Sequence, residues 1–98
     1  MNVEVPVERI EAFCRKWKIR EFALFGSVLR DDFRPDSDVD VLVTFDEGAR
    51  YSLFDLGDMN MELEAMFGRR VDLVQKDRIE NPFRRRHILA NHKVVFAA

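Results

Sequence analysis

The spacing of apolar residues changes several times along the chain, and each change predicts a secondary-structure element. Between residues 6 and 17 the apolar positions recur at helical spacing, after a proline that suits a first helical position. Residues 19–25 (IREFALF) are short, apolar-rich and followed by Gly26, which is typical of a strand entering a tight turn. A brief helix from about Ser27 to Arg30 and a polar loop then lead to residues 38–45 (DVDVLVTF), which predict a central strand covered on both faces.

The second half of the chain predicts two further helices and one or two more strands. Ser52, with Asp55 three residues on, resembles a capping box in which Asp replaces Glu, and the apolar stripe that follows ends at Gly68. Residues 70–74 predict a third short strand. Asn81 and Pro82 begin a last helix to about Asn91, and the VVF segment beyond it is expected to be a small strand or a packed tail. This order predicts a small mixed α/β (α+β) fold, with three to four strands and flanking helices.

Composition narrows the class of protein. The chain has 98 residues, 47% of them hydrophobic and 35% charged, so one globular domain over residues 1–98 is expected. No apolar run approaches the roughly 18 residues of a membrane span, and the first residues lack the pattern of a signal peptide. A cytoplasmic location without membrane association is therefore expected.

The 16 basic and 18 acidic residues nearly cancel in net charge, which does not favour a generic nucleic-acid binder. The lone Cys14 lies at helical spacing among apolar residues and is interpreted as a core residue.

Two aspartates occupy alternate positions of the predicted central strand. Asp38 and Asp40 therefore point to the same side, with Cα atoms about 6.5–7 Å apart, while the valines between and after them fill the other side. Burying unpaired carboxylates costs several kcal/mol, so these groups need a cation or an open cleft. Asp72 repeats the pattern in the third strand. Three carboxylates on two neighbouring strands predict a Mg²⁺ site, where two ions about 3.5–4 Å apart would clamp the attacking and leaving oxygens of a phosphoryl or nucleotidyl transfer.

The turn before this strand is suited to phosphate binding. Gly26 has no Cβ and allows the backbone to approach a triphosphate, while Ser27 adds a hydroxyl at the start of a helix. A turn glycine followed by a helix-capping serine explains the same dipeptide without any ligand, so Gly-Ser alone is weak support for a binding site.

The spacing of the two motifs carries more information than either motif alone. Gly-Ser, ten residues and Asp-x-Asp, between two strands, resembles the signature of the DNA polymerase β-like nucleotidyltransferase superfamily. LFGSVLRDDFRPDSDVDVLVTF is similar to the corresponding segment of the minimal nucleotidyltransferases of bacteria and archaea, and the resemblance covers Phe22 to Val74 well. It implies a polymerase β-like palm that transfers a nucleoside monophosphate from a nucleoside triphosphate such as ATP, with Mg²⁺ and release of pyrophosphate.

The resemblance also implies a role for each matched residue. Gly26 and Ser27 would hold the triphosphate, and Arg30 would neutralise phosphate charge. Asp38 and Asp40 would ligate Mg²⁺, and Asp72 would assist the second ion or take the proton of the acceptor hydroxyl, which makes these three the predicted catalytic and metal-binding residues. One departure is Asp31, which stands where the family often has Gly, and it leaves the metal ligands intact.

A chain of this length has no room for a domain that grips the acceptor. Minimal nucleotidyltransferases resemble the antitoxin half of toxin–antitoxin modules whose other half is commonly a HEPN-domain ribonuclease, so the resemblance implies adenylyl transfer to a tyrosine of such a toxin. Whether the chain forms a homodimer or a hetero-oligomer is left open. One alternative is an antitoxin that masks its toxin by contact alone. Another is a nucleotidyltransferase acting on an RNA end, for which Arg84, Arg85 and Arg86 followed by His87 are the candidate phosphate contacts. Successive arginines on a helix diverge, so a solvated face is the preferred interpretation and RNA binding is not expected.

The remaining candidate residues have simpler interpretations. His87 and His92 lack the spacing of zinc ligands and are interpreted as surface or helix-end residues. Phe33, Tyr51 and Phe54 lie in regions from which an aromatic ring could stack on a base, although core or interface packing is the preferred interpretation.

Overall fold

The computed structural model describes residues 3–30, 34 and 36–98 and contains every predicted element, with bounds that differ by one or two residues. The undecided VVF segment belongs to a strand. No helix in these ranges combines the length and the apolar sequence that crossing a bilayer requires. In chain order the elements are α1 (Val7–Lys16), β1 (Ile19–Phe25), the 3₁₀ helix η1 (Gly26–Leu29), β2 (Val39–Phe45), α2 (Leu53–Phe67), β3 (Val71–Gln75), the 3₁₀ helix η2 (Lys76–Arg78), α3 (Pro82–Ala90) and β4 (His92–Ala97).

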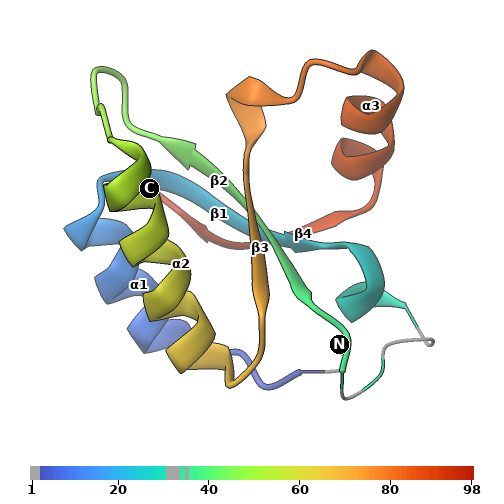
Figure 1. The fold of residues 1–98 in the computed structure, drawn as a ribbon. Coiled ribbons are helices and arrows are strands. Elements are labelled where there is room, and N and C mark those ends of the chain that lie inside the picture. The colour runs from blue at the N-terminus through green and yellow to red at the C-terminus, as the bar shows by residue number, and fades with distance from the viewer. Residues whose placement is uncertain (1–2, 31–33, 35) are drawn as a thin grey trace.

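The four strands form one mixed sheet in the order β3-β2-β1-β4 (Figure 1). β1 runs antiparallel to β2 and β4, and β2 runs parallel to β3. The register aligns four residues in one row across the sheet, because Phe25 pairs with both His92 and Asp40, and Asp40 pairs with Asp72. Side chains in such a row project from the same face of the sheet. Residues far apart in the sequence thus become neighbours.

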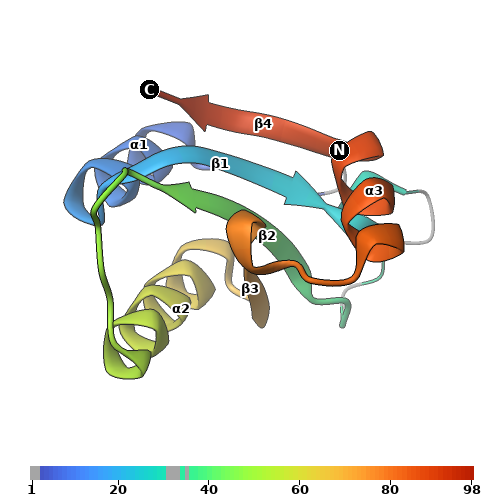
Figure 2. The same ribbon diagram turned by 90° about the horizontal axis from the view of Figure 1, so that it is seen from above.

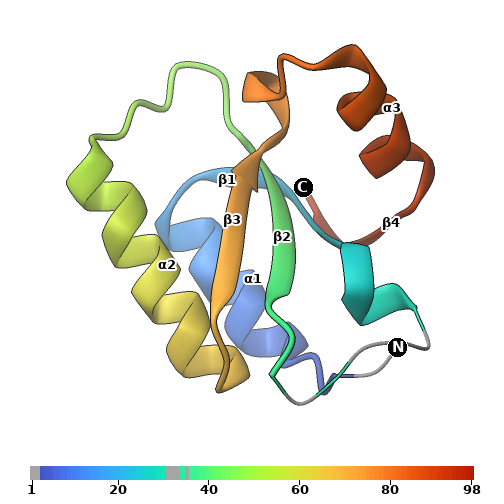
Figure 3. The same cartoon turned by 45° about the vertical axis from the view of Figure 1, so that its right-hand side comes forward.

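The two faces of the sheet are covered by different helices. α1 and α2 lie on one face and α3 lies on the other (Figure 2). Val39, Val41 and Val43 of β2 pack into the core under α1 and α2, whereas Leu42 packs with Ile88 of α3 on the opposite side. Asp40 shares the face of Leu42, as the alternation predicted, and Asp38 directly precedes β2. η1 and α3 flank this face together (Figure 3), so Asp40 lies beside a partly covered surface.

Local sequence signals set the ends of the helices. The Ser52 Oγ accepts from the Asp55 N–H at 3.2 Å, and an Asp55 carboxylate oxygen accepts from the Ser52 N–H at 3.0 Å, so the capping box is confirmed with Asp in place of Glu. α2 ends at Gly68 in the left-handed conformation. Asn81 accepts from two N–H groups of the first turn of α3. Cys14 is buried in the core, as predicted, and its burial raises the pKa of the thiol to about 12.

Candidate functional site

The turn that follows β1 lies against the carboxylate of Asp40. Gly26 adopts a φ of 76°, a left-handed conformation that favours glycine. A Cβ at this position would overlap the Asp40 Oδ2, so the backbone of Gly26 and the side chain of Asp40 occupy adjoining space that admits no larger residue. The sequence predicted a close approach of this glycine to a ligand. The structure shows a close approach to Asp40 itself, which the sequence pattern did not indicate.

Ser27 and Arg30 belong to the same short element. η1 begins at Gly26, and the Arg30 N–H donates to the Ser27 carbonyl oxygen at 2.9 Å. Ser27 is half-buried and Arg30 is exposed at the edge of the face that carries Asp40. With four residues, η1 has little helix dipole, so any attraction for an anion comes from the N–H groups of the turn and from the Arg30 guanidinium.

Asp40 is the electrostatic centre of the three predicted carboxylates. Burial raises its pKa above the usual value, and the negative charges of Asp72 and Asp38 raise it further. The cationic side chains of Arg30 and Arg84 act in the opposite direction. The fold has therefore brought both Asp38 and Asp72 within electrostatic reach of Asp40.

The outer aspartate already has a cationic partner. Asp38 forms an ion pair with Arg70, whose Nε lies 3.2 Å from the Asp38 Oδ1, and the two side chains are 46% and 79% exposed. Across the described residues no three His, Cys, Asp or Glu side chains converge closely enough to hold one ion. The donor set nevertheless suits Mg²⁺, because carboxylate oxygens are its preferred protein ligands and a cation would relieve the repulsion at Asp40.

A cavity of about 490 Å³ opens beside Asp40. Its lining residues come from the Gly26 turn and η1, from α3, and from strands β1, β2 and β4. Its polar side chains comprise one carboxylate, two guanidinium groups, two imidazoles and one amide, contributed by Asp40, Arg30, Arg84, His87, His92 and Asn91. Such a concave site, with an apolar floor and convergent polar groups, is typical of a small-molecule pocket.

Sequence comparison assigns the family. The model of a family described as "Nucleotidyltransferase domain" matches residues 8–95. The chain belongs to this nucleotidyltransferase family. The match confirms the resemblance inferred from the Gly-Ser and Asp-x-Asp motifs.

Known proteins similar to this nucleotidyltransferase support the same assignment. Protein adenylyltransferase MntA of Thermococcus cleftensis is 41% identical over 66 residues, which are 67% of this chain and 65% of the relative. A solved structure described as that of a minimal nucleotidyltransferase is 34% identical, with a TM-score of 0.70 and coverage of 89% of this chain and 86% of the other. The fold also matches a chain in the complex of the tri-AMPylated HEPN toxin of Shewanella oneidensis with an MNT antitoxin, at a TM-score of 0.65, 18% identity and coverage of 94% and 70%. The mixed α/β fold is thereby confirmed.

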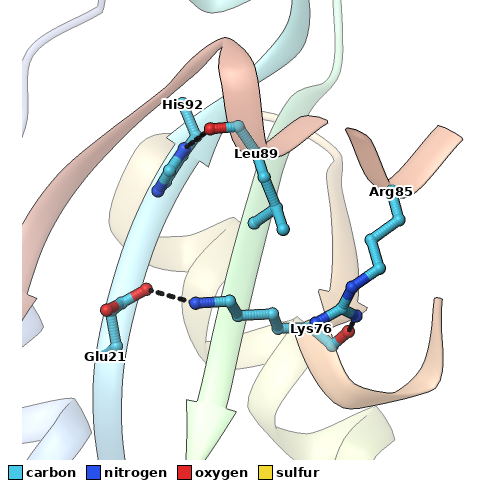
Figure 4. A network of polar contacts seen from close by, with 5 residues as sticks. All are labelled: Glu21, Lys76, Arg85, Leu89 and His92. Atoms are coloured by element: carbon cyan, nitrogen blue, oxygen red, sulfur yellow. Dashed lines mark hydrogen bonds and ion pairs between the residues drawn. The ribbon is translucent and has the colours of Figure 1, made fainter. Parts of the chain in front are cut away.

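The arginines and the histidine of α3, and His92 at the start of β4, occupy different surroundings in this nucleotidyltransferase. Arg84 lines the cavity, whereas the Arg85 Nη1 donates to the Lys76 carbonyl oxygen at 2.6 Å (Figure 4), so neighbouring arginines diverge as predicted. The interpretation of His87 as a surface, helix-end residue is confirmed, since it is exposed in the last turn of α3, and His92 is half-buried at the start of β4. Both also line the cavity, which the sequence did not indicate. The signal that places His92 there is its pairing with Phe25, which no local pattern contains.

Two of the aromatic candidates, Tyr51 and Phe54, do not line the nucleotidyltransferase cavity. The Tyr51 hydroxyl donates to the Trp17 carbonyl oxygen, and the Tyr51 ring packs against Phe45, so its role is core packing as preferred above. Phe54 is 87% exposed on α2, on the far face of the sheet. Phe33 and Asp31 lie outside the described residues.

Proposed function

We propose that this nucleotidyltransferase is an antitoxin that transfers AMP from ATP to a hydroxyl group of its cognate HEPN-domain toxin, with Mg²⁺ as the metal. The observation that carries the proposal is the packing of the Gly26 turn against Asp40, in a row with Asp72. This arrangement sets a phosphate-binding turn beside carboxylates that can hold a cation. The relative named protein adenylyltransferase MntA and the complex with an AMPylated HEPN toxin support the choice of acceptor.

Each site residue has a role in the proposed reaction. The Gly26–Ser27 turn and the Arg30 guanidinium bind the triphosphate, and Asp38 and Asp40 hold Mg²⁺. Bound Mg²⁺ neutralises charge that develops on the phosphate oxygens. A new bond forms between the acceptor oxygen and the α-phosphorus, while the bond from that phosphorus to the bridging oxygen of the β-phosphate breaks and pyrophosphate leaves. Asp72, next to Asp40 on the edge strand, takes the proton of the acceptor hydroxyl.

Labelled ATP tests the proposed transfer. The cognate toxin is incubated with this protein, Mg²⁺ and ATP labelled either at the α-phosphate or at the γ-phosphate. We expect label on the toxin from α-labelled ATP only, together with loss of its ribonuclease activity, because AMP is the group transferred. Absence of α-label on the toxin across a range of Mg²⁺ concentrations would refute the proposal, and transfer of γ-label would indicate a kinase instead.

Masking by contact is the second candidate function, since the ion pair with Arg70 already occupies Asp38. A contact mask needs no metal, so it would still neutralise the toxin when Asp38 and Asp40 are both replaced with Asn. An adenylyltransferase with the same two substitutions would bind the toxin and leave its ribonuclease activity intact. Ribonuclease assays at matched concentrations of wild-type and doubly substituted protein distinguish the two functions.

The ion pair between Arg70 and Asp38 predicts a competition with Mg²⁺. Replacing Arg70 with Gln should lower the Mg²⁺ concentration required for half-maximal transfer by up to about fivefold, because an exposed ion pair contributes up to about 1 kcal/mol. A Mg²⁺ titration of the transfer rate measures this value. Arg78→Gln, which removes the same charge from η2, serves as the control and should leave the titration unchanged. A higher Mg²⁺ requirement in Arg70→Gln would instead indicate that Arg70 helps to bind phosphate.

A further inference from the structure

The cavity beside Asp40 extends well beyond this carboxylate. His92 lies two strands away from Asp40 in the same row, which corresponds to about 10 Å at the usual strand spacing. Along α3, Arg84 lies at the end near Asp40, and Asn91 follows about 10 Å further along the helix axis. The cavity therefore has one end at Asp40 and the opposite end at Asn91 and His92.

The character of the lining changes between the two ends. Near Asp40 the lining carries the charges of the guanidinium groups already described. The middle is apolar, since Phe25 of β1, Leu29 of η1 and Ile88 of α3 contribute to it. An apolar surface of this kind can pack against the face of a planar ring. A charged phosphate gains no binding energy from such contact. An elongated ligand with a charged end and a planar ring system matches this order.

Two hydrogen-bond acceptors are held in place at the far end. The Asn91 Nδ2 donates to the His87 carbonyl oxygen at 2.9 Å, so the Oδ1 of the same amide is the group left to accept. The His92 Nδ1 lies 2.8 Å from the Leu89 carbonyl oxygen (Figure 4). A carbonyl oxygen only accepts, so this nitrogen carries the hydrogen, and the Nε2 of the neutral ring is an acceptor.

We propose that this cavity binds the nucleoside of the substrate and that Asn91 and His92 select a 6-aminopurine. The proposal rests on the proposed function, because it takes the triphosphate to lie at Gly26. With the phosphates there, the ribose and base extend over Phe25, and the base edge meets the two acceptors. The 6-amino group of adenine donates hydrogen bonds at this edge. A 6-oxopurine such as guanine or hypoxanthine presents an oxygen there, opposite two acceptors, and is disfavoured.

Binding of ATP and inosine triphosphate (ITP) tests this assignment. ITP carries an oxygen in place of the 6-amino group and has the same ribose and triphosphate. Calorimetric titrations with Mg²⁺ and without toxin should show that wild-type protein binds ATP about tenfold more tightly than ITP, the discrimination expected of a hydrogen-bonded base edge. His92→Phe, which keeps a ring and loses the acceptor, should reduce this ratio to about twofold, and Asn91→Ala should do so independently.

A matched variant separates hydrogen bonding from packing. His92→Gln keeps an acceptor near the position of Nε2, so it should retain most of the preference for ATP. The melting temperature of each variant shows whether it is folded. Equal binding of ATP and ITP by the wild-type protein, or a ratio unchanged in both His92→Phe and Asn91→Ala, would overturn the proposal.

The experiments distinguish failure of the proposed transfer to the toxin from failure of the proposed base-binding site. The titrations contain no toxin, so an intact preference for ATP without labelling of the toxin would remove only the proposed acceptor. Labelling of the toxin by a protein that does not distinguish ATP from ITP would remove only the assignment of the base to this cavity.

Discussion

Asp40→Asn is expected to lower the rate of AMP transfer at least about 10³-fold. Asp40 is half-buried, adjoins the Gly26 turn and is the only one of the three predicted carboxylates that lines the cavity. A catalytic metal contributes several kcal/mol of transition-state stabilisation, and about 4 kcal/mol corresponds to a factor of 10³. Asn has nearly the same shape as Asp, so the expected loss of activity would result from the missing charge. Transfer of α-label to the toxin measures it.

The same substitution should stabilise the folded chain. The pKa of Asp40 is raised in the folded protein, so the folded state binds this proton more tightly than the unfolded state does. The favourable contribution of the protonated group is fully present below the ordinary Asp pKa of about 3.9 and is lost as the pH rises through the raised pKa. At pH 7 without Mg²⁺, Asp40→Asn should therefore melt a few degrees above wild type, and the difference should shrink as the pH falls toward 4.

Asp58→Asn provides the control for both measurements. Asp58 is exposed on α2, on the opposite face of the sheet, so its removal changes the net charge equally without touching the site. Transfer and melting temperature should stay close to wild type. Wild-type activity in Asp40→Asn would refute the proposed role of Asp40. A lower melting temperature at pH 7 would show that its charge is compensated in the folded state.

Gly26→Ala is expected to reduce AMP transfer about 10²-fold. The added Cβ would overlap the Asp40 Oδ2, so the carboxylate has to move, and a displacement of about 1 Å at a catalytic group typically costs a factor of 10². The left-handed φ of 76° adds about 1–2 kcal/mol of backbone strain, which in a chain of this size lowers the melting temperature by roughly 5 °C or more. Rate assays at a temperature where the variant is fully folded separate the two effects.

Gly68→Ala tests whether strain alone explains the loss. Gly68 also has a left-handed φ, of 68°, but open space surrounds the position where a Cβ would lie. This variant should lose stability and keep its transfer rate. If Gly26→Ala were as active as Gly68→Ala, the contact between Gly26 and Asp40 would have no catalytic role.

The sequence predicted the site best where the signal is local. The alternation in DVDVLVTF places Asp40 on one face and the valines on the other, because neighbouring strand residues point in opposite directions. Ser52, Gly68 and Asn81 mark helix ends, because their side chains or backbone conformations satisfy polar groups within one turn. The prediction that three carboxylates surround one ion was less complete. Asp38 forms an ion pair with Arg70, which directly precedes β3, and this contact depends on the register between β2 and β3.

The cavity wall formed by α3 was outside the reach of sequence reasoning. His87 and His92 carry no motif, and Arg84 looks like any member of a basic run. Their positions follow from the antiparallel pairing of β4 with β1, which sets His92 beside Phe25 and holds α3 over the same face as Asp40. Strand pairing between segments about 70 residues apart depends on the packing of the whole core rather than on neighbours in the chain.

The sequence by itself determined the elements, the face on which Asp40 lies, and the family, because hydrophobic period, capping residues and motif spacing are local properties of the chain. Only the tertiary structure decided which groups meet. The register of four strands aligned His92, Phe25, Asp40 and Asp72, and the left-handed turn at Gly26 set its backbone against the Asp40 carboxylate. These contacts join segments that are distant in sequence, and their geometry is set when the two faces of the sheet pack against their helices.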